Sequence, residues 1–134
     1  MRGDPMRDDP MRDDRVALFV YGTLAPGRRA WRFLEPYTVE VRPAAVAGRL
    51  YDTGRGYPAA VFGPGAGLVH GHLCLLDDPP LARLDVWEGD EYERRRIVTD
   101  DGTEAFAYHW RAPVAGCRRL PDGRWPESSP VAGE

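Results

Sequence analysis

Residues 16–27 have the sequence Val16-Ala17-Leu18-Phe19-Val20-Tyr21-Gly22-Thr23-Leu24-Ala25-Pro26-Gly27. The apolar first half is short and rich in β-branched and aromatic residues, which favours a buried strand over a helix. The second half is a turn, and Gly22 has no Cβ to keep a ligand away from the backbone. Successive backbone N–H groups over residues 21–24 can bind a carboxylate or carbonyl oxygen. The same pattern is also typical of a first strand that ends in an ordinary tight turn.

The chain has 134 residues and a formal net charge of -3, which suits one domain with a sizeable core. This charge does not indicate a nucleic-acid or membrane surface, so neither partner is expected. Cys74 and Cys117 lie far apart without a metal-ligand partner at short spacing, and we expect no metal or cofactor. The chain shows neither a signal peptide nor a membrane-spanning segment, so we expect it to be cytoplasmic.

Both ends of the chain differ in composition from the middle. Residues 1–15 are a five-residue tandem repeat whose only apolar residue is methionine. Such a segment cannot bury enough surface to offset its ordering entropy, so we expect a disordered tail. Each repeat begins with methionine, which leaves the translation start open. Residues 126–134 are expected to be a flexible tail, and the folded domain should therefore span residues 16–125.

The middle of the chain consists mostly of short segments with strand character. After the opening strand, extended segments are predicted over residues 37–41, 45–51, 57–62, 68–76, 92–99 and 103–110. Pro58 restricts its segment to an edge or to the start of a strand. The last two segments flank Asp101-Gly102, which predicts a hairpin.

Two helices are predicted between these strands. The convincing one covers residues 80–88, with Asp77 or Asp78 as its N-cap and Gly89 just past its end. A shorter one covers residues 28–34 and ends at Pro36. Short strands joined by turns, with helices against them, predict an α+β fold: a small, mostly antiparallel β-barrel with flanking short helices.

Glu88 is the strongest candidate for a catalytic residue. Helical spacing places it on one stripe with Leu81 and Leu84, which should face the core. Burial and the negative end of the helix dipole both disfavour a carboxylate there, so its pKa should be raised. A general base working near neutral pH benefits from such a shift. The pattern leaves a structural alternative open, in which Glu88 pairs with an arginine among residues 94–96.

Two other groups of reactive side chains have simpler interpretations. His70 and His72 share one strand face, but no third metal ligand is evident, so we expect a packed or surface pair. Cys74 lies within an apolar strand and should be buried and inert.

Several short motifs, in their order and spacing, resemble the γ-glutamylcyclotransferase-like (AIG2-like) family. Tyr21-Gly22-Thr23-Leu24 resembles its Tyr-Gly-(Ser/Thr)-Leu loop. Residues 84–89, followed by Tyr92 and Arg94, resemble its Leu-Asp-x-x-Glu-Gly…Tyr-x-Arg segment. Matching patterns also occur at residues 48–52, 56–59, 71–73 and 122–125. The chain lacks the asparagine that often follows the first glycine turn in relatives.

The resemblance implies a barrel with a pocket at its mouth, in which Tyr21, Gly22, Thr23 and Leu24 hold a γ-glutamyl group. It makes Glu88 the acid/base of an amine-releasing enzyme of the lyase or transferase type. In the family reaction the substrate's own α-amine attacks the γ-carbonyl, which closes 5-oxoproline and releases an amine. Tyr57, Tyr92 and Tyr108 are candidates to line the pocket, with a place in the core as the alternative.

These motifs leave two other functions open. One is a non-catalytic binding module of the same fold. Such a module would lack the acid at the motif position, whereas this chain has Glu88 there, which favours an enzyme. The other is a transferase in which Glu88 deprotonates a separate amine. The substrate is expected to be a γ-glutamyl amino acid, a γ-glutamylamine or a γ-glutamylated biosynthetic intermediate, and the motifs fit a monomer and a homodimer equally.

Overall fold

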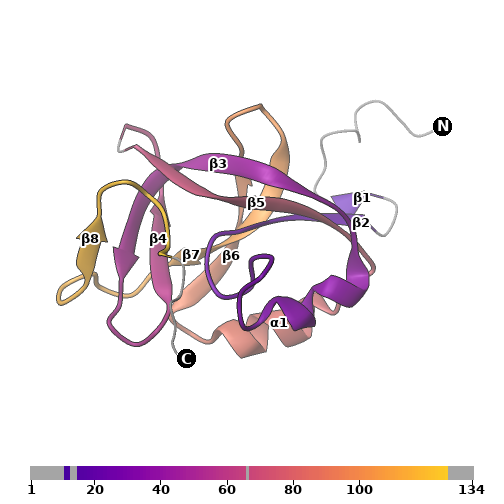
Figure 1. The fold of residues 1–134 in the computed structure, drawn as a ribbon, viewed down its shortest axis with the longest axis horizontal. Helices are drawn as coiled ribbons and strands as arrows, with labels where there is room; N and C mark the ends of the chain where they lie inside the picture. The colour runs from indigo at the N-terminus through magenta and orange to yellow at the C-terminus, as the bar shows by residue number, and fades with distance from the viewer. Residues whose placement is uncertain (1–10, 13–14, 66, 127–134) are drawn as a thin grey trace.

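The computed structural model describes residues 11–12, 15–65 and 67–126 of the chain (Figure 1). Its strands are β1 (Met11–Arg12), β2 (Arg15–Val20), β3 (Thr38–Asp52), β4 (Pro58–Phe62), β5 (Leu68–Asp77), β6 (Tyr92–Val98), β7 (Glu104–Trp110) and β8 (Arg118–Leu120). The helices are α1 (Leu81–Glu88) and two 3-10 helices, η2 (Trp31–Phe33) and η3 (Glu35–Tyr37). The strands predicted at β4, β5, β6 and β7 are confirmed to within one residue at each end.

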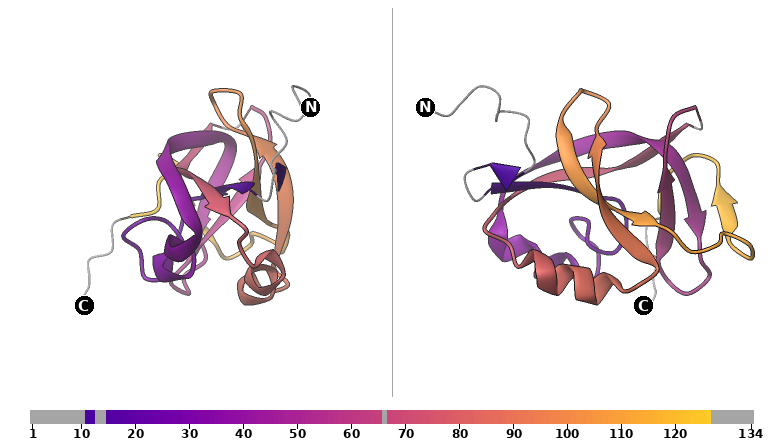
Figure 2. Two further views of the ribbon diagram at one scale, coloured as in Figure 1. Left: turned by 90° about the vertical axis from the view of Figure 1, so that its right-hand side faces the viewer. Right: turned by 180° about the vertical axis from the view of Figure 1, so that it is seen from behind.

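The strands form one sheet that curls into a nearly closed barrel, with the helices on one side (Figures 1 and 2). Its order is β4-β3-β5-β2-β7-β6, while β1 pairs with β2 and β8 with β3. All pairs are antiparallel except β2 with β7, which are parallel. The prediction of an α+β fold with a mostly antiparallel barrel is therefore confirmed. β4 lies at one end of the order, as Pro58 required.

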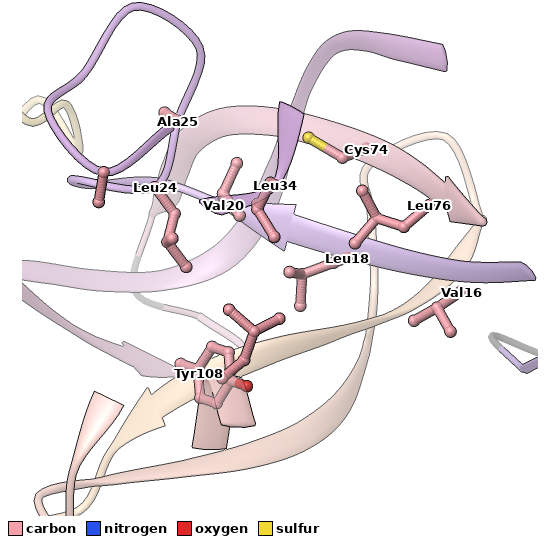
Figure 3. Packing of buried hydrophobic residues seen from close by; sticks show 11 residues of the cluster. Val16, Leu18, Val20, Leu24, Ala25, Leu34, Cys74, Leu76 and Tyr108 are labelled. Atoms are coloured by element: carbon pink, nitrogen blue, oxygen red, sulfur yellow. The ribbon is translucent and has the colours of Figure 1, made fainter. Parts of the chain in front are cut away.

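Strand β2 is a central strand of the sheet, between β5 and β7. Its alternate side chains enter two different core clusters, because successive residues of a strand point to opposite faces. Val16, Leu18 and Val20 join the cluster shown in Figure 3, which includes Leu84 of α1. Phe19 belongs to the other cluster. The strand is thus buried on both faces, which explains its unbroken apolar sequence.

Strand β3 is one continuous strand of 15 residues where the sequence suggested two segments around Pro43. Pro43 lies opposite His72 in the β3–β5 register. Proline removes one donor from the ladder, but its fixed φ suits extended backbone, so the strand continues through it. The first half of β3 pairs with β5 and the second half with β4 and β8.

The short helix predicted over residues 28–34 is wrong. The chain forms the two 3-10 helices η2 and η3 instead, and Pro36 lies inside η3. Proline is accepted there because the first N–H groups of a helical turn have no partner to lose.

The helix predicted over residues 80–88 is confirmed as α1, and Gly89 forms its C-cap with φ 92°. The predicted aspartate cap is wrong, since Pro80 occupies the N-cap position without a side-chain hydrogen bond. No helix of the described residues combines the length and apolar character needed to cross a membrane.

The predicted N-terminal tail overlaps with described structure. Met11 and Arg12 pair with Val16 and Arg15 as strand β1, and Arg15 itself belongs to β2. These residues add to the edge of β2 through backbone pairing, which needs no apolar side chains. The remaining tail predictions concern residues 1–10, 13–14 and 127–134, which lie outside the described residues.

Gly71 of β5 lies close to the backbone at the point where the chain leaves β2. A Cβ at this position would overlap the carbonyl oxygen of Val20 and come within 3.0 Å of the Cα of Tyr21. Gly71→Ala is therefore expected to lower the free energy of unfolding by about 1–3 kcal/mol, as overpacking does. Gly63→Ala is the matched control, because a Cβ there meets nothing within 4 Å. Urea denaturation checks both variants, and equal midpoints would contradict the close approach.

Candidate active site

The end of β2 and the end of α1 meet at a cavity of about 330 Å³. The cavity brings together every residue that the sequence analysis proposed for the site. Its lining consists of Phe19, Val20, Tyr21, Gly22, Thr23, Leu24, Arg29, Tyr57, Pro58, Trp87, Glu88, Tyr92 and Tyr108. Its volume is at the small end of the range of ligand pockets, which suits a small metabolite or one end of a larger one.

The loop after β2 offers backbone donors to this cavity. Its carbonyl groups are engaged, since Gly22 accepts from Ala25 N–H at 3.0 Å and Thr23 accepts from Ala30 N–H at 2.9 Å. Among the described residues, the N–H groups of Gly22, Thr23 and Leu24 have no acceptor. Because Gly22 and Leu24 are buried, and buried N–H groups are nearly always paired, these donors can take a ligand oxygen.

The glycine in this loop also has a packing role. A Cβ on Gly22 would lie 2.7 Å and 2.8 Å from Cγ and Cδ of Pro58. The proline ring is buried at the start of β4, so it cannot move aside easily. A larger residue at Gly22 would therefore disturb the packing of β4 as well as any bound ligand.

Glu88 is the acid that lines the cavity, at the last residue of α1. Burial raises the pKa of its carboxyl to about 8, and the negative charge of Asp85 adds to this shift. The direction agrees with the expectation from burial. The contribution of Asp85 was not anticipated, because the side-chain directions of the two acids depend on tertiary contacts.

The alternative pairing of Glu88 with an arginine does not occur within the described residues. Arg94 binds Asp85 through two bonds, Nε–Oδ1 at 2.9 Å and Nη2–Oδ2 at 3.0 Å. Arg95 pairs with Glu93 at 3.0 Å, and Arg96 approaches Glu104 at 3.8 Å. Glu88 is left without an ion-pair partner in the described part of the chain.

Asp85 and Glu88 are one helical turn apart and have opposite pKa shifts. Burial raises the pKa of Asp85, but hydrogen bonds from Arg94 and Tyr108 outweigh it, so the net pKa is lowered. Asp85 thus stays ionised while Glu88 holds its proton more tightly. Two neighbouring carboxyls whose pKa values are shifted in opposite directions are typical of sites that move protons.

Three tyrosines form fixed walls around Glu88. Tyr21 donates to the carbonyl of Tyr108 at 2.6 Å, Tyr108 donates to Asp85 Oδ1 at 2.7 Å, and Tyr92 donates to the carbonyl of Pro58 at 2.5 Å. Burial raises the pKa of all three phenols above the usual value. They therefore stay neutral, and their hydroxyl protons are already committed to the protein.

The histidine pair of the sequence analysis lies outside this cavity. His70 and His72 line a second cavity of about 1040 Å³, and both side chains are partly buried. Across residues 11–12, 15–65 and 67–126, no group of three or more His, Cys, Asp or Glu is placed to hold a metal ion. Cys74 is buried as predicted, and burial raises the pKa of its thiol to about 12, which makes it unreactive.

Known proteins resemble this chain in sequence and in fold. Residues 18–127 match the family described as gamma-glutamyl cyclotransferase, AIG2-like. The chain belongs to this family. It is 35% identical over 116 residues to a gamma-glutamylcyclotransferase family protein of Citrobacter rodentium, covering 81% of this chain and 93% of that protein.

Two further members of the γ-glutamylcyclotransferase-like family are informative. The gamma-L-glutamyl-butirosin B gamma-glutamyl cyclotransferase of Niallia circulans is 39% identical over 75 residues, which cover 56% of this chain and 46% of that protein. The solution NMR structure of protein ytfP from Escherichia coli superposes with a TM-score of 0.58 at 32% identity. It covers 82% of this chain and 96% of that one.

Proposed function

We propose that this protein is a γ-glutamyl cyclotransferase that releases 5-oxoproline and a free amine from a γ-glutamyl compound. The observation that carries the proposal is a partly buried Glu88, without an ion-pair partner in the described residues, in a cavity that residues 22–24 also line. The N–H groups of these three residues have no acceptor in the described part of the chain. This arrangement offers a base with a raised pKa and donors for an oxygen. The nucleophile can come from the substrate, so no Ser–His or Cys–His pair is needed.

The reaction follows from these two features. The N–H groups of residues 22–24 hold an oxygen of the γ-glutamyl group, which is bent so that its α-nitrogen faces its γ-carbonyl. Ionised Glu88 takes a proton from the α-ammonium, and the freed nitrogen attacks the γ-carbon. The N–H donors stabilise the negative oxygen that develops. The bond to the leaving nitrogen then breaks as protonated Glu88 gives its proton to that nitrogen. The ring nitrogen still carries two hydrogens, and one of them passes through Glu88 to the released amine, so that the products are 5-oxoproline and an ammonium and Glu88 is ionised again.

The raised pKa of Glu88 is compatible with its role as a base. Before substrate binds, the carboxyl with its pKa of about 8 is mostly protonated at neutral pH. The ammonium of a bound substrate is an opposite charge at close range, which favours the ionised form. Binding thus prepares the base, and holding the two reacting ends together supplies a large part of the acceleration.

The relatives support the same reaction class. The name of the Niallia circulans protein states that it removes a γ-glutamyl group by cyclotransfer. Its aligned part covers 56% of this chain.

A screen of γ-glutamyl amino acids and γ-glutamylamines for 5-oxoproline tests the proposal. We expect at least one compound to yield 5-oxoproline and free amine in equal amounts. Transfer of the glutamyl group to an added amine without 5-oxoproline would favour the transferase alternative. Saturable binding of γ-glutamyl compounds without turnover would favour the binding module.

A further inference from the structure

The inference concerns Arg29 and the chemical class of the released amine, and it rests on the proposed function. The lining of the cavity combines the buried residues Gly22 and Leu24 with two exposed residues, Arg29 and Trp87, which mark its open end. The γ-glutamyl group must bend beside Glu88 and the loop in order to cyclise. The leaving amine therefore points toward the open end, where Arg29 lies.

Among the described residues, Arg29 is the only cation in the lining of this cavity. In the described part of the chain it has no acidic partner, and its guanidinium donates one hydrogen bond, from Nη2 to the carbonyl of Gly56 at 3.3 Å. A guanidinium carries five N–H donors, so most of them are available to a ligand.

The neighbouring arginines are occupied, which distinguishes Arg29 from them. Arg28 donates to the carbonyls of Trp125 and Pro126 at 2.8 Å and 2.6 Å. Arg32 donates to the carbonyl of Arg29 at 2.7 Å. Arg55 forms an ion pair with Glu91 at 3.2 Å.

The charges around the open end discriminate between classes of amine. Glu88 is the only acid that the described residues contribute to the lining, and the proposed mechanism places it at the reacting nitrogen. A leaving group with further ammonium groups would meet Arg29 with no carboxylate to balance it, and like charges are unfavourable. A leaving group with a carboxylate could form paired hydrogen bonds with the guanidinium fork.

We propose that Arg29 binds a carboxylate on the leaving amine, so that the preferred substrates are γ-glutamyl amino acids. The N–H groups of residues 22–24 remain for the oxygens of the γ-glutamyl group itself. Arg29 is a specificity-determining residue in this account, and it takes no part in the proton transfers.

Two substrates that differ in a single carboxylate test this assignment: γ-glutamyl-L-alanine and γ-glutamyl-ethylamide. We expect the wild-type protein to prefer the alanine compound in kcat/KM. Arg29→Gln should lower kcat/KM for this compound about tenfold, mainly through KM, because an exposed charge pair is modest. The value for the ethylamide should stay within about twofold. Arg83→Gln is the matched control, an exposed arginine of α1 that does not line the cavity.

The outcomes separate this inference from the proposed function. Equal losses on both substrates would mean that Arg29 binds the γ-glutamyl carboxylate, and no loss on either would mean that it binds neither; both overturn the inference. A wild-type preference for the ethylamide, or for another amine without a carboxylate, overturns it while the cyclotransferase function stands. If no γ-glutamyl compound yields 5-oxoproline, the proposed function fails and the inference with it.

Discussion

Glu88→Gln is expected to lower kcat by about 10²–10⁴-fold, the usual contribution of a positioned general base. Glutamine keeps the size of the side chain but cannot accept the ammonium proton. The measurement is 5-oxoproline formation from the best γ-glutamyl compound of the screen. Turnover close to that of the wild-type protein would remove Glu88 from the mechanism.

The same variant should fold at least as well as the wild-type protein. An unfolded Glu ionises near its ordinary pKa of 4.5, whereas folded Glu88 ionises at about 8. The wild-type protein therefore loses stability as pH rises from 4.5 to 8, and the glutamine variant does not share this loss. We expect the Tm of Glu88→Gln to exceed the wild-type Tm at pH 9 and to equal it at pH 4, as followed by circular dichroism.

Asp85→Asn is the matched control for the activity measurement. Asp85 lies one turn before Glu88, but its carboxylate is held by Arg94 and Tyr108 and does not line the cavity. We expect the variant to keep its turnover within about tenfold of wild type. Its stability should fall by about 1 kcal/mol, because the ion pair that it loses is partly exposed. A loss of turnover equal to that of Glu88→Gln would show that the two acids work as a unit.

Local sequence pattern was sufficient for most of the barrel. β2 is a short apolar run that ends in a glycine turn, β5 is rich in apolar residues, and the hairpin of β6 and β7 has its Asp-Gly turn. Each of these signals depends only on neighbouring residues. The pattern misled where two structures compete over a few residues, as at residues 28–37, where single 3-10 turns replaced a helix. Such short turns carry little periodicity, since they involve only three residues each.

The candidate site was predictable in its two motifs and not in their surroundings. Glu88 and residues 21–24 could be proposed from spacing and family resemblance. The partner of Arg94 could not be predicted, because the sequence allows both Asp85 and Glu88 to approach β6, and only the structure shows that Asp85 does so. No sequence motif marked Arg29 as a cavity residue, because its place there depends on how η2 and the loop before it pack. Gly22 was proposed for ligand approach, whereas its contact with Pro58 gives it a packing reason as well.

The pH dependence of kcat/KM should show the ionisation of Glu88 directly. This parameter reports the groups of the free enzyme, and burial together with Asp85 raises the pKa of Glu88 to about 8. The base must be ionised to act, so kcat/KM should rise about tenfold per pH unit well below 8, or about 50-fold between pH 6 and pH 8. Above pH 8 this dependence should level off.

Two comparisons assign this rising limb of the pH profile to Glu88. The substrate ammonium stabilises the ionised carboxyl, so the limb in kcat should lie at lower pH than the limb in kcat/KM. Asp85→Asn removes a neighbouring negative charge, which disfavours the ionised form of Glu88. That variant should therefore also move the kcat/KM limb to lower pH, and the structural loss of an ion pair alone would not do this. A profile that is flat from pH 6 to pH 8, or a limb that stays in place in Asp85→Asn, would contradict a buried base coupled to Asp85.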